Sequence, residues 1–273
     1  MTRYPAPGKL NLFLHVLRRR PDGYHGLQTV FRLVEAADEV GISLREDGEI
    51  RFAGPFGDDN LCVRAARALQ AAAGTALGCD LELHKALPVG GDMGGGSSDA
   101  ATVLIVLNRL WRLGLESARL RELGRALGAD VPFFLYGRNA LAEGIGERLS
   151  ELELPRAWYL VLTPQVQVST KEIFSDPSLT PSGKRLKIPP FLSGQGRNDL
   201  QAVAAARYPD VKAHLDWLAE RVPDARMTGS GACVFAEFKS EAEALALQAE
   251  LPGTMRGFVT RGLDEHPLRA WVA

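Results

Sequence analysis

The segment from Pro88 to Ala101 has the residue types and the spacing that could bind phosphate. Its letters are PVGGDMGGGSSDAA, with five glycines in the seven residues 90–96 and two serines directly after them. Glycine has no Cβ, so backbone N–H groups can come close to a ligand. The first N–H groups of a helix have no intrahelical partner, and the helix dipole there favours an anion. We therefore predict a cradle for the phosphates of a nucleotide. A flexible surface loop is the plainer interpretation, but an amphipathic helical pattern follows at once.

This glycine-rich segment does not match two common phosphate-binding motifs. Walker A requires Gly-Lys followed by Ser or Thr, whereas the two Gly-Lys pairs of this chain precede Leu10 and Arg185. The dinucleotide fingerprint requires three glycines at fixed offsets before a helix, and here Asp92 or Asp99 occupies one of those offsets. The segment is therefore a glycine loop of another type.

Two further segments carry residues that could do chemistry. In PAPGKLNL, residues 5–12, Lys9 and Asn11 alternate on a predicted strand and so point to one face. In MTGSGACVF, residues 227–235, small residues lead into a second strand pattern. Taken alone, the first could be a solvated strand face and the second a tight turn.

Composition limits the function classes. The chain has 273 residues, 46% of them hydrophobic, and a formal net charge of −1. This charge gives no whole-protein attraction for nucleic acid or an anionic membrane, so we expect neither as a partner. The three cysteines, 62, 79 and 233, are far apart, which favours reduced thiols and a cytoplasmic location. The N-terminal residues lack the apolar core of a signal peptide, and no apolar run approaches the ~20 residues of a membrane-spanning helix.

The hydrophobic pattern predicts a mixed α and β chain. Alternating apolar residues predict strands at 9–17, 40–45, 79–84 and 158–163. Helical periodicity predicts helices at 61–73, 98–113, 117–127, 211–221 and 240–251. Residues 175–198 are rich in Pro, Ser and Gly and are predicted to form a long loop. We place a domain boundary between residues 154 and 155, where Leu154-Pro155 precedes a new strand.

The three segments together resemble the GHMP kinase superfamily, which includes galactose, homoserine, mevalonate and phosphomevalonate kinases. The order is Pro-x-Pro-Gly-Lys-x-Asn, then Gly-Gly-Gly-Ser-Ser-x-Ala-Ala, then Gly-Ser-Gly-Ala. Within it, the similarity is closest to the kinases that act on a cytidine-diphosphate-bearing methylerythritol in the non-mevalonate isoprenoid pathway. That closer match lies in PDGYH at 21–25, DDNLCVRAA at 58–66, GADVPFF at 128–134 and AEGIG at 142–146.

The resemblance implies an α+β fold of two domains with the active site between them. Residues 1–154 would form a ribosomal protein S5 domain 2-like ATP-binding domain, and residues 155–273 a ferredoxin-like domain. The implied reaction is ATP-dependent phosphorylation of the 2-hydroxyl of 4-(cytidine 5'-diphospho)-2-C-methyl-D-erythritol, a small-molecule substrate.

The resemblance assigns the catalytic base to Asp130 and its partner to Lys9. A carboxylate can accept the hydroxyl proton, and a nearby ammonium keeps that carboxylate ionised. The sequence alone would not pair these residues, because 121 positions separate them. Without the resemblance, a helix-end or turn aspartate would be the preferred interpretation of Asp130.

The resemblance also implies where ATP and Mg²⁺ bind. The phosphates would lie on the glycine loop, with the serines on phosphate oxygens or Mg²⁺; the other metal ligands are not predicted. Asp92 departs from the usual small or neutral residue, so we expect its carboxylate to point outward or to meet the metal. The implied ATP-binding residues are Asn60, Leu61 and Lys85 beside the adenine, and Pro88, Val89, Gly90, Gly91, Asp92, Met93, Gly94, Gly95, Gly96, Ser97 and Ser98. For the first three, the plainer interpretations are a helix cap, a core leucine and a solvated lysine.

For the acceptor, the resemblance implies an aromatic sandwich around cytosine with a histidine at the base edge. An aromatic side chain can stack on a base, and histidine can both donate and accept a hydrogen bond. Core packing is the plainer interpretation of both phenylalanines. The implied acceptor-binding residues are Asn11, Tyr24, His25, Phe31, Thr170 and Phe174.

Three alternatives stay open at this point. The chain could phosphorylate another small molecule within the same superfamily. It could be a serine amide hydrolase, because Gly-Gly-Ser-Ser occurs in that class too, although the further glycine pair and second serine are missing. It could be a nucleotide-binding regulator without activity, although Lys9 and Asp130 are both retained. The oligomeric state is not predicted.

Overall fold

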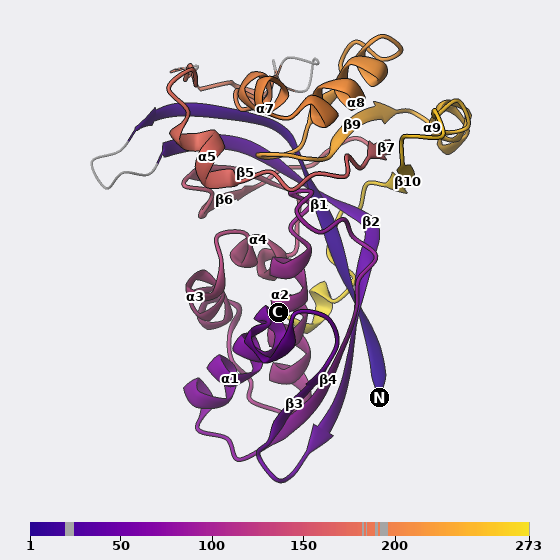
Figure 1. Ribbon diagram of the computed structural model, residues 1–273. Coiled ribbons are helices and arrows are strands. Elements are labelled where there is room, and N and C mark those ends of the chain that lie inside the picture. Colours follow the sequence, from indigo (N-terminus) through magenta and orange to yellow (C-terminus); the bar gives the residue numbers. More distant parts are fainter. Residues whose placement is uncertain (20–24, 182, 184, 189–190, 192–195, 273) are drawn as a thin grey trace.

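A long antiparallel hairpin runs through the molecule. The computed structural model describes residues 1–19, 25–181, 183, 185–188, 191 and 196–272. Strand β1 (Thr2–Arg19) pairs with β2 (His25–Arg45) from Thr2 opposite Ile42 to Arg19 opposite His25. The hairpin extends from the helices α1–α4 at one end of the molecule to the second sheet at the other (Figure 1). Because one strand pair reaches both ends, residues of β1 can face either part.

The first lobe is a six-stranded sheet with four helices packed against it. The strand order is β3-β4-β2-β5-β6, with β1 added on β2. Its main core is formed by apolar residues of β1, β2, β4 and the helices. The further elements are β3 (Ile50–Ala53), α1 (Leu61–Ala73), β4 (Gly78–His84), α2 (Gly95–Leu110), α3 (Ser117–Leu127), α4 (Val131–Tyr136), β5 (Ala140–Gly144) and β6 (Arg148–Glu151), with a short 3-10 helix at Gly57–Asp59.

The second lobe is a four-stranded antiparallel sheet in the order β10-β7-β9-β8, with helices around it. Its core includes Leu14 and Val16 from the far end of β1. The elements are β7 (Trp158–Leu162), α5 (Thr170–Ser175), α7 (Gln201–Arg207), α8 (Pro209–Ala219), β8 (Arg226–Met227), β9 (Val234–Phe238), α9 (Glu241–Gln248) and β10 (Gly257–Arg261).

The chain does not divide cleanly between the lobes. The first sheet ends at Glu151 and the second begins at Trp158. The C-terminal residues, however, return to the first lobe, where Leu268 and Val272 join its core (Figure 1). The boundary between residues 154 and 155 therefore stays a prediction. It separates the two sheets, but the hairpin and the C-terminal segment each contact the lobe on the other side of it.

Several element predictions are confirmed and others need correction. The helices predicted at 61–73 and 117–127 have those bounds. The helix predicted at 98–113 begins at Gly95 and ends at Leu110, so the last glycines of the loop are already helical. The strand predicted at 40–45 is the end of a 21-residue strand. Polar residues in the first part of that strand interrupt the alternation of apolar and polar residues, so that part was not predicted. The predicted loop 175–198 begins where α5 ends, and part of it lies outside the described residues.

Within the part of the chain that the structure describes, no helix is both long and apolar enough to span a bilayer.

Candidate active site

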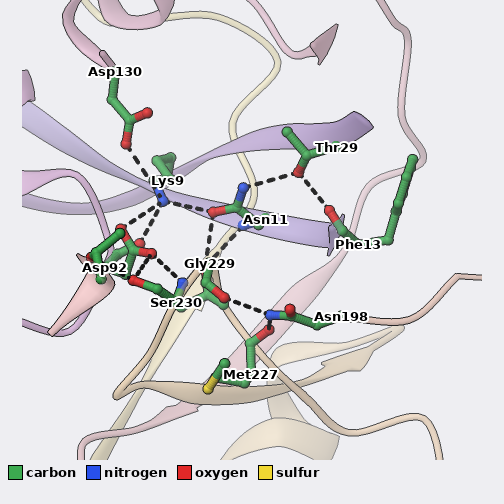
Figure 2. Close-up of polar contacts among 12 residues, drawn as sticks. Lys9, Asn11, Phe13, Thr29, Asp92, Asp130, Asn198, Met227, Gly229 and Ser230 are labelled. Carbon is green, nitrogen blue, oxygen red and sulfur yellow. Dashed lines mark hydrogen bonds and ion pairs between the residues drawn. The ribbon is translucent and has the colours of Figure 1, made fainter. Parts of the chain in front are cut away.

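Lys9 lies at the centre of a polar network between the lobes. Its side chain is fully buried, and its backbone N–H donates to the Met93 carbonyl of the glycine loop at 2.9 Å. The ammonium Nζ donates to Asn11 Oδ1 and to the Asp92 carbonyl oxygen, each at 2.6 Å (Figure 2). Two carboxylates flank it, with Asp92 Oδ1 at 3.5 Å and Asp130 Oδ2 at 3.7 Å. A buried ammonium is stable only when paired in this way.

Asp130 directly precedes α4 but does not cap that helix. Its side chain makes no capping hydrogen bond, although it occupies the N-cap position, and it points toward Lys9 (Figure 2). Burial raises the pKa of the Asp130 carboxyl, Lys9 lowers it and Asp92 raises it, with a net upward shift. Asp130 therefore does lie at a helix end, as the plainer interpretation predicts, but its side chain is directed to Lys9 and not to the helix. Helix α2 packs against both β1 and α4, and this packing brings the predicted pair together.

Asn11 holds Lys9 and joins the lobes. Its Oδ1 accepts from Lys9, and its Nδ2 donates to Thr29 Oγ1 at 2.9 Å. Its backbone N–H donates to Thr228 Oγ1 at 2.9 Å, in the loop that follows β8. Asn198 supports the same loop by donating to the Met227 and Gly229 carbonyls (Figure 2). The prediction that Lys9 and Asn11 share a face is confirmed.

The glycine loop borders a cavity of about 460 Å³. A Cβ at Gly94, whose φ is +72°, would lie 2.8 Å from the Phe134 ring. At Gly95, the first residue of α2, a Cβ would lie 2.9 Å from Lys85 Nζ. Ser98 Oγ is fully buried and has no hydrogen-bond partner among the described residues. The cavity wall includes Asn60, Leu61, Lys85, Pro88, Val89, Gly90, Asp92, Met93, Gly94, Gly95, Gly96, Ser97, Asp130 and Thr170.

Lys85 is not a solvated lysine. It forms ion pairs with Asp38 and, at 2.9 Å, with Asp99 Oδ2. The second oxygen of buried Asp38 accepts the backbone N–H groups of Ala86 and Leu87, which fixes the approach to the glycine loop. Burial raises the pKa of Asp99 to about 7, against the attraction of Lys85. Asp38 was missed because nothing in its local pattern marks it, and Asp99 was assigned no role although it lies in the glycine-rich segment.

Asn60 is a helix cap, as its plainer interpretation predicts. Its Oδ1 accepts from the Cys62 N–H at 2.7 Å and so caps α1. Both Asn60 and Leu61 nevertheless line the cavity, together with Phe56. A capped helix start and an apolar side chain can border an adenine without giving up these roles.

One alternative expected for Asp92, an outward-pointing carboxylate, needs correction, whereas contact with the metal stays a prediction. The carboxylate accepts from the Ser230 backbone N–H and, at 3.1 Å, from Ser230 Oγ (Figure 2). The physical reason is that two donors of the second lobe and the ammonium of Lys9 surround it. Ser230 itself was missed, although the small-residue loop containing it was singled out.

The predicted acceptor residues are only partly assembled. The His25 and Phe174 rings are stacked with centroids 5.5 Å apart and planes 27° apart. Thr170 Oγ1 is 2.7 Å from Ser230 Oγ. Phe31 is only 4% exposed and packs on Phe133, with Lys9 Nζ 5.7 Å from its ring centroid. Tyr24 lies outside the described residues.

Metal-binding clusters are absent in the described part of the chain, which holds no group of three or more His, Cys, Asp or Glu side chains placed for a metal ion.

Comparisons with known proteins agree with this geometry. Residues 60–138 match the GHMP kinases N terminal domain, and residues 189–257 match the GHMP kinases C terminal model. A 4-diphosphocytidyl-2-C-methyl-D-erythritol kinase of Aromatoleum aromaticum is 54% identical, covering 98% of this chain and 95% of the relative. One of Thiobacillus denitrificans is 55% identical, covering 98% of each chain.

Solved structures give the same result. A crystal structure of 4-(cytidine 5'-diphospho)-2C-methyl-D-erythritol kinase is similar with a TM-score of 0.87 and 35% identity, over 96% of this chain and 100% of that one. The mevalonate kinase of Methanococcus jannaschii shares the fold, with a TM-score of 0.68 at 13% identity, over 96% of this chain and 98% of that chain. The chain therefore belongs to the GHMP kinase family and has its two-domain α+β fold.

Proposed function

We propose that this protein transfers the γ-phosphoryl group of ATP to the 2-hydroxyl of 4-(cytidine 5'-diphospho)-2-C-methyl-D-erythritol, as an enzyme of the non-mevalonate isoprenoid pathway. The observation that carries the chemistry is the buried Lys9 beside Asp130, at the end of a cavity lined by the glycine loop. Relatives named for this activity, similar over nearly the whole chain, support the choice of acceptor.

Asp130 is proposed as the base and Lys9 as its charge partner. As the acceptor oxygen bonds to the γ-phosphorus and the bond to ADP breaks, the hydroxyl proton passes to the Asp130 carboxylate. Lys9 holds that carboxylate ionised and stabilises the negative charge that develops on the acceptor oxygen. Such a transfer depends on positioning and charge stabilisation more than on covalent help.

The glycine loop is proposed to bind the ATP phosphates. The first turn of α2 lines the cavity, and side chains at residues 94 and 95 would collide with neighbours. A helix start of this kind offers free N–H groups to an anion. Ser97 lies at the cavity wall. Ser98 is fully buried and does not line the cavity, and we propose it as a partner of a phosphate oxygen or Mg²⁺ because its hydroxyl has no hydrogen-bond partner among the described residues. When bound there, Mg²⁺ would neutralise the negative charge of the phosphates. The adenine would lie toward Asn60 and Leu61.

Acceptor binding is proposed for Asn11, Tyr24, His25, Phe31, Thr170 and Phe174, as the resemblance implies. A cytoplasmic location is also proposed, on the ground that the three cysteines are free and buried. Membership in the GHMP kinases removes the serine amide hydrolase alternative.

An acceptor panel tests this function. The purified protein is incubated with ATP and Mg²⁺ and, in turn, the cytidine-diphosphate methylerythritol, mevalonate, homoserine and galactose, while ADP release is followed. We expect ADP only with the first acceptor, and a product heavier by one phosphoryl group in mass spectrometry. Equal efficiency with any other acceptor would show that the proposed acceptor is wrong, while ADP release with none would contradict the kinase activity.

A further inference from the structure

Asp92 occupies an unusual place in the glycine loop. It has φ +55°, a left-handed conformation that non-glycine residues rarely adopt. Its carboxylate accepts both donors of Ser230 in the second lobe, and a Cβ at Gly229 would collide with that same carboxylate. The loop therefore holds a strained residue whose side chain reaches across to the other lobe.

The same carboxylate competes for Lys9. Lys9 Nζ lies 3.5 Å from Asp92 Oδ1 and 3.7 Å from Asp130 Oδ2, so one ammonium serves two carboxylates (Figure 2). The charged groups that act on Asp130 are Lys9 of β1 and Asp92 of the glycine loop. Each carboxylate weakens the hold of the ammonium on the other, because like charges near one cation repel each other.

We propose that Asp92 is a positioning residue with two actions: its carboxylate fastens the glycine loop to Ser230 of the second lobe, and it shares Lys9 with Asp130. The first action places the ATP phosphates, and the second reduces the preference of Asp130 for its ionised form. The proposal rests on the proposed function, in which Asp130 is the base.

Two substitutions separate the actions. Asp92→Asn removes the charge but keeps an oxygen that can accept from Ser230, and asparagine tolerates positive φ. Asp92→Gly removes both charge and acceptor, and glycine adopts this backbone without strain. Both variants should therefore fold, which circular dichroism and thermal unfolding check. Glu39→Gln is the matched control, because it removes an exposed carboxylate that pairs with Arg3, away from the cavity.

The charge action is measured through pH. The acid limb of kcat/KM reports the pKa of the essential base in the free enzyme. We expect this limb to move to lower pH in both Asp92 variants and to stay in place in Glu39→Gln. Titration of the Asp130 carboxyl by ¹³C NMR should move in the same direction, and this readout needs no substrate.

The fastening action is measured through ATP. Since both variants lack the charge, their difference isolates the hydrogen bonds to Ser230. We expect KM for ATP to be about ten-fold higher in Asp92→Gly than in Asp92→Asn, the effect of losing about one net hydrogen bond.

Two results would overturn the proposal. One is an acid limb and an Asp130 titration that stay in place in both Asp92 variants; the other is an equal KM for ATP in both. A wild-type protein that fails to phosphorylate the cytidine-diphosphate acceptor would instead refute the proposed function, and the NMR titration would still judge the charge action of Asp92.

Discussion

At the scale of single residues, the site depends on the oxygen atoms that surround the buried ammonium of Lys9. Lys9 has two oxygen acceptors at 2.6 Å and two carboxylates at longer range. Asp130 is 27% exposed, so a substrate hydroxyl can reach it, whereas Lys9 is sealed. No spacing rule predicts this pair; the sequence suggested it only through a resemblance that covers both segments. The pairing of Lys85 with Asp38 and Asp99 was found only in three dimensions, because the resemblance assigns neither aspartate a role.

The first residue-scale prediction concerns the base. Asp130→Asn should keep the fold and ligand binding but lower kcat by ~10²–10⁴-fold, the range for a lost general base. Lys9→Ala should also lower kcat, and the double variant should lose less than the product of the two effects, because the residues act as a unit. Steady-state kinetics of the four proteins measure this. A correctly folded Asp130→Asn protein with near-wild-type kcat would remove Asp130 from the mechanism.

The second residue-scale prediction concerns the base pocket. The His25 and Phe174 rings are stacked with centroids 5.5 Å apart, so the histidine expected at the edge of the base covers one face of Phe174. Cytosine must therefore stack on the other face of Phe174, or the two rings must separate. Phe174→Ala should weaken acceptor binding by about 5- to 150-fold and leave ATP nearly unchanged.

His25→Ala should behave differently from Phe174→Ala, since a hydrogen-bonding site rejects an unmatched analogue more strongly than a stacking surface does. His25→Ala should relax the preference for cytidine over uridine acceptors. Phe174→Ala should instead weaken the binding of both acceptors by a similar factor. The ratio of kcat/KM for the two acceptors decides the point. An unchanged ratio in His25→Ala would assign base recognition to other groups.

At the scale of elements, the junction of the glycine loop and α2 determines what fits in the cavity. The sequence predicted the loop and the helix but not where one becomes the other. Gly95 and Gly96 are poor helix formers, so propensity placed the start at Ser98, and packing overrode it. The first turn of α2 thereby becomes glycine-rich, and Gly95, Gly96 and Ser97 line the cavity.

This junction gives the element-scale prediction. Alanine at Gly95 has no backbone penalty in a helix, but its Cβ would lie 2.9 Å from Lys85 Nζ and 3.0 Å from Asp38 Oδ2. Displacement of this ion pair should disturb the phosphate cradle, and Gly95→Ala should raise the Kd for ATP by about ten-fold or more, and that for the acceptor less. Gly253→Ala is the control, because nothing lies within 4 Å of its Cβ. Calorimetric titration with each ligand measures both constants, and equal weakening of the two would argue against the cradle.

At the scale of the whole molecule, the lobes are joined by strands and by the returning C-terminus. The strand pattern at 9–17 was visible in the sequence, but the reach of the hairpin into the second core was not. Leu14 and Val16 pack with residues more than 140 positions away, such as Leu160 and Leu162. Local periodicity reports which face is apolar and not which partner covers it. The return of residues 263–272 to the first lobe was missed for the same reason.

The last prediction concerns this C-terminal segment. His266 is 1% exposed; its backbone N–H donates to the Gly137 carbonyl, and its ring Nδ1 accepts from the Leu268 N–H. Burial lowers the pKa of His266 to about 4, so the folded state keeps the ring neutral. Between that value and the ordinary pKa of ~6.5, the unfolded chain binds more protons than the folded one, and stability falls as pH decreases. The loss is of the order of ~3 kcal/mol across this window. Asparagine can place an acceptor near the position of Nδ1 but does not titrate, so His266→Asn should reduce this slope. Urea unfolding at pH 7.5 and pH 4.5 compares the two proteins, and an identical pH dependence would show that His266 does not control the docking of this segment.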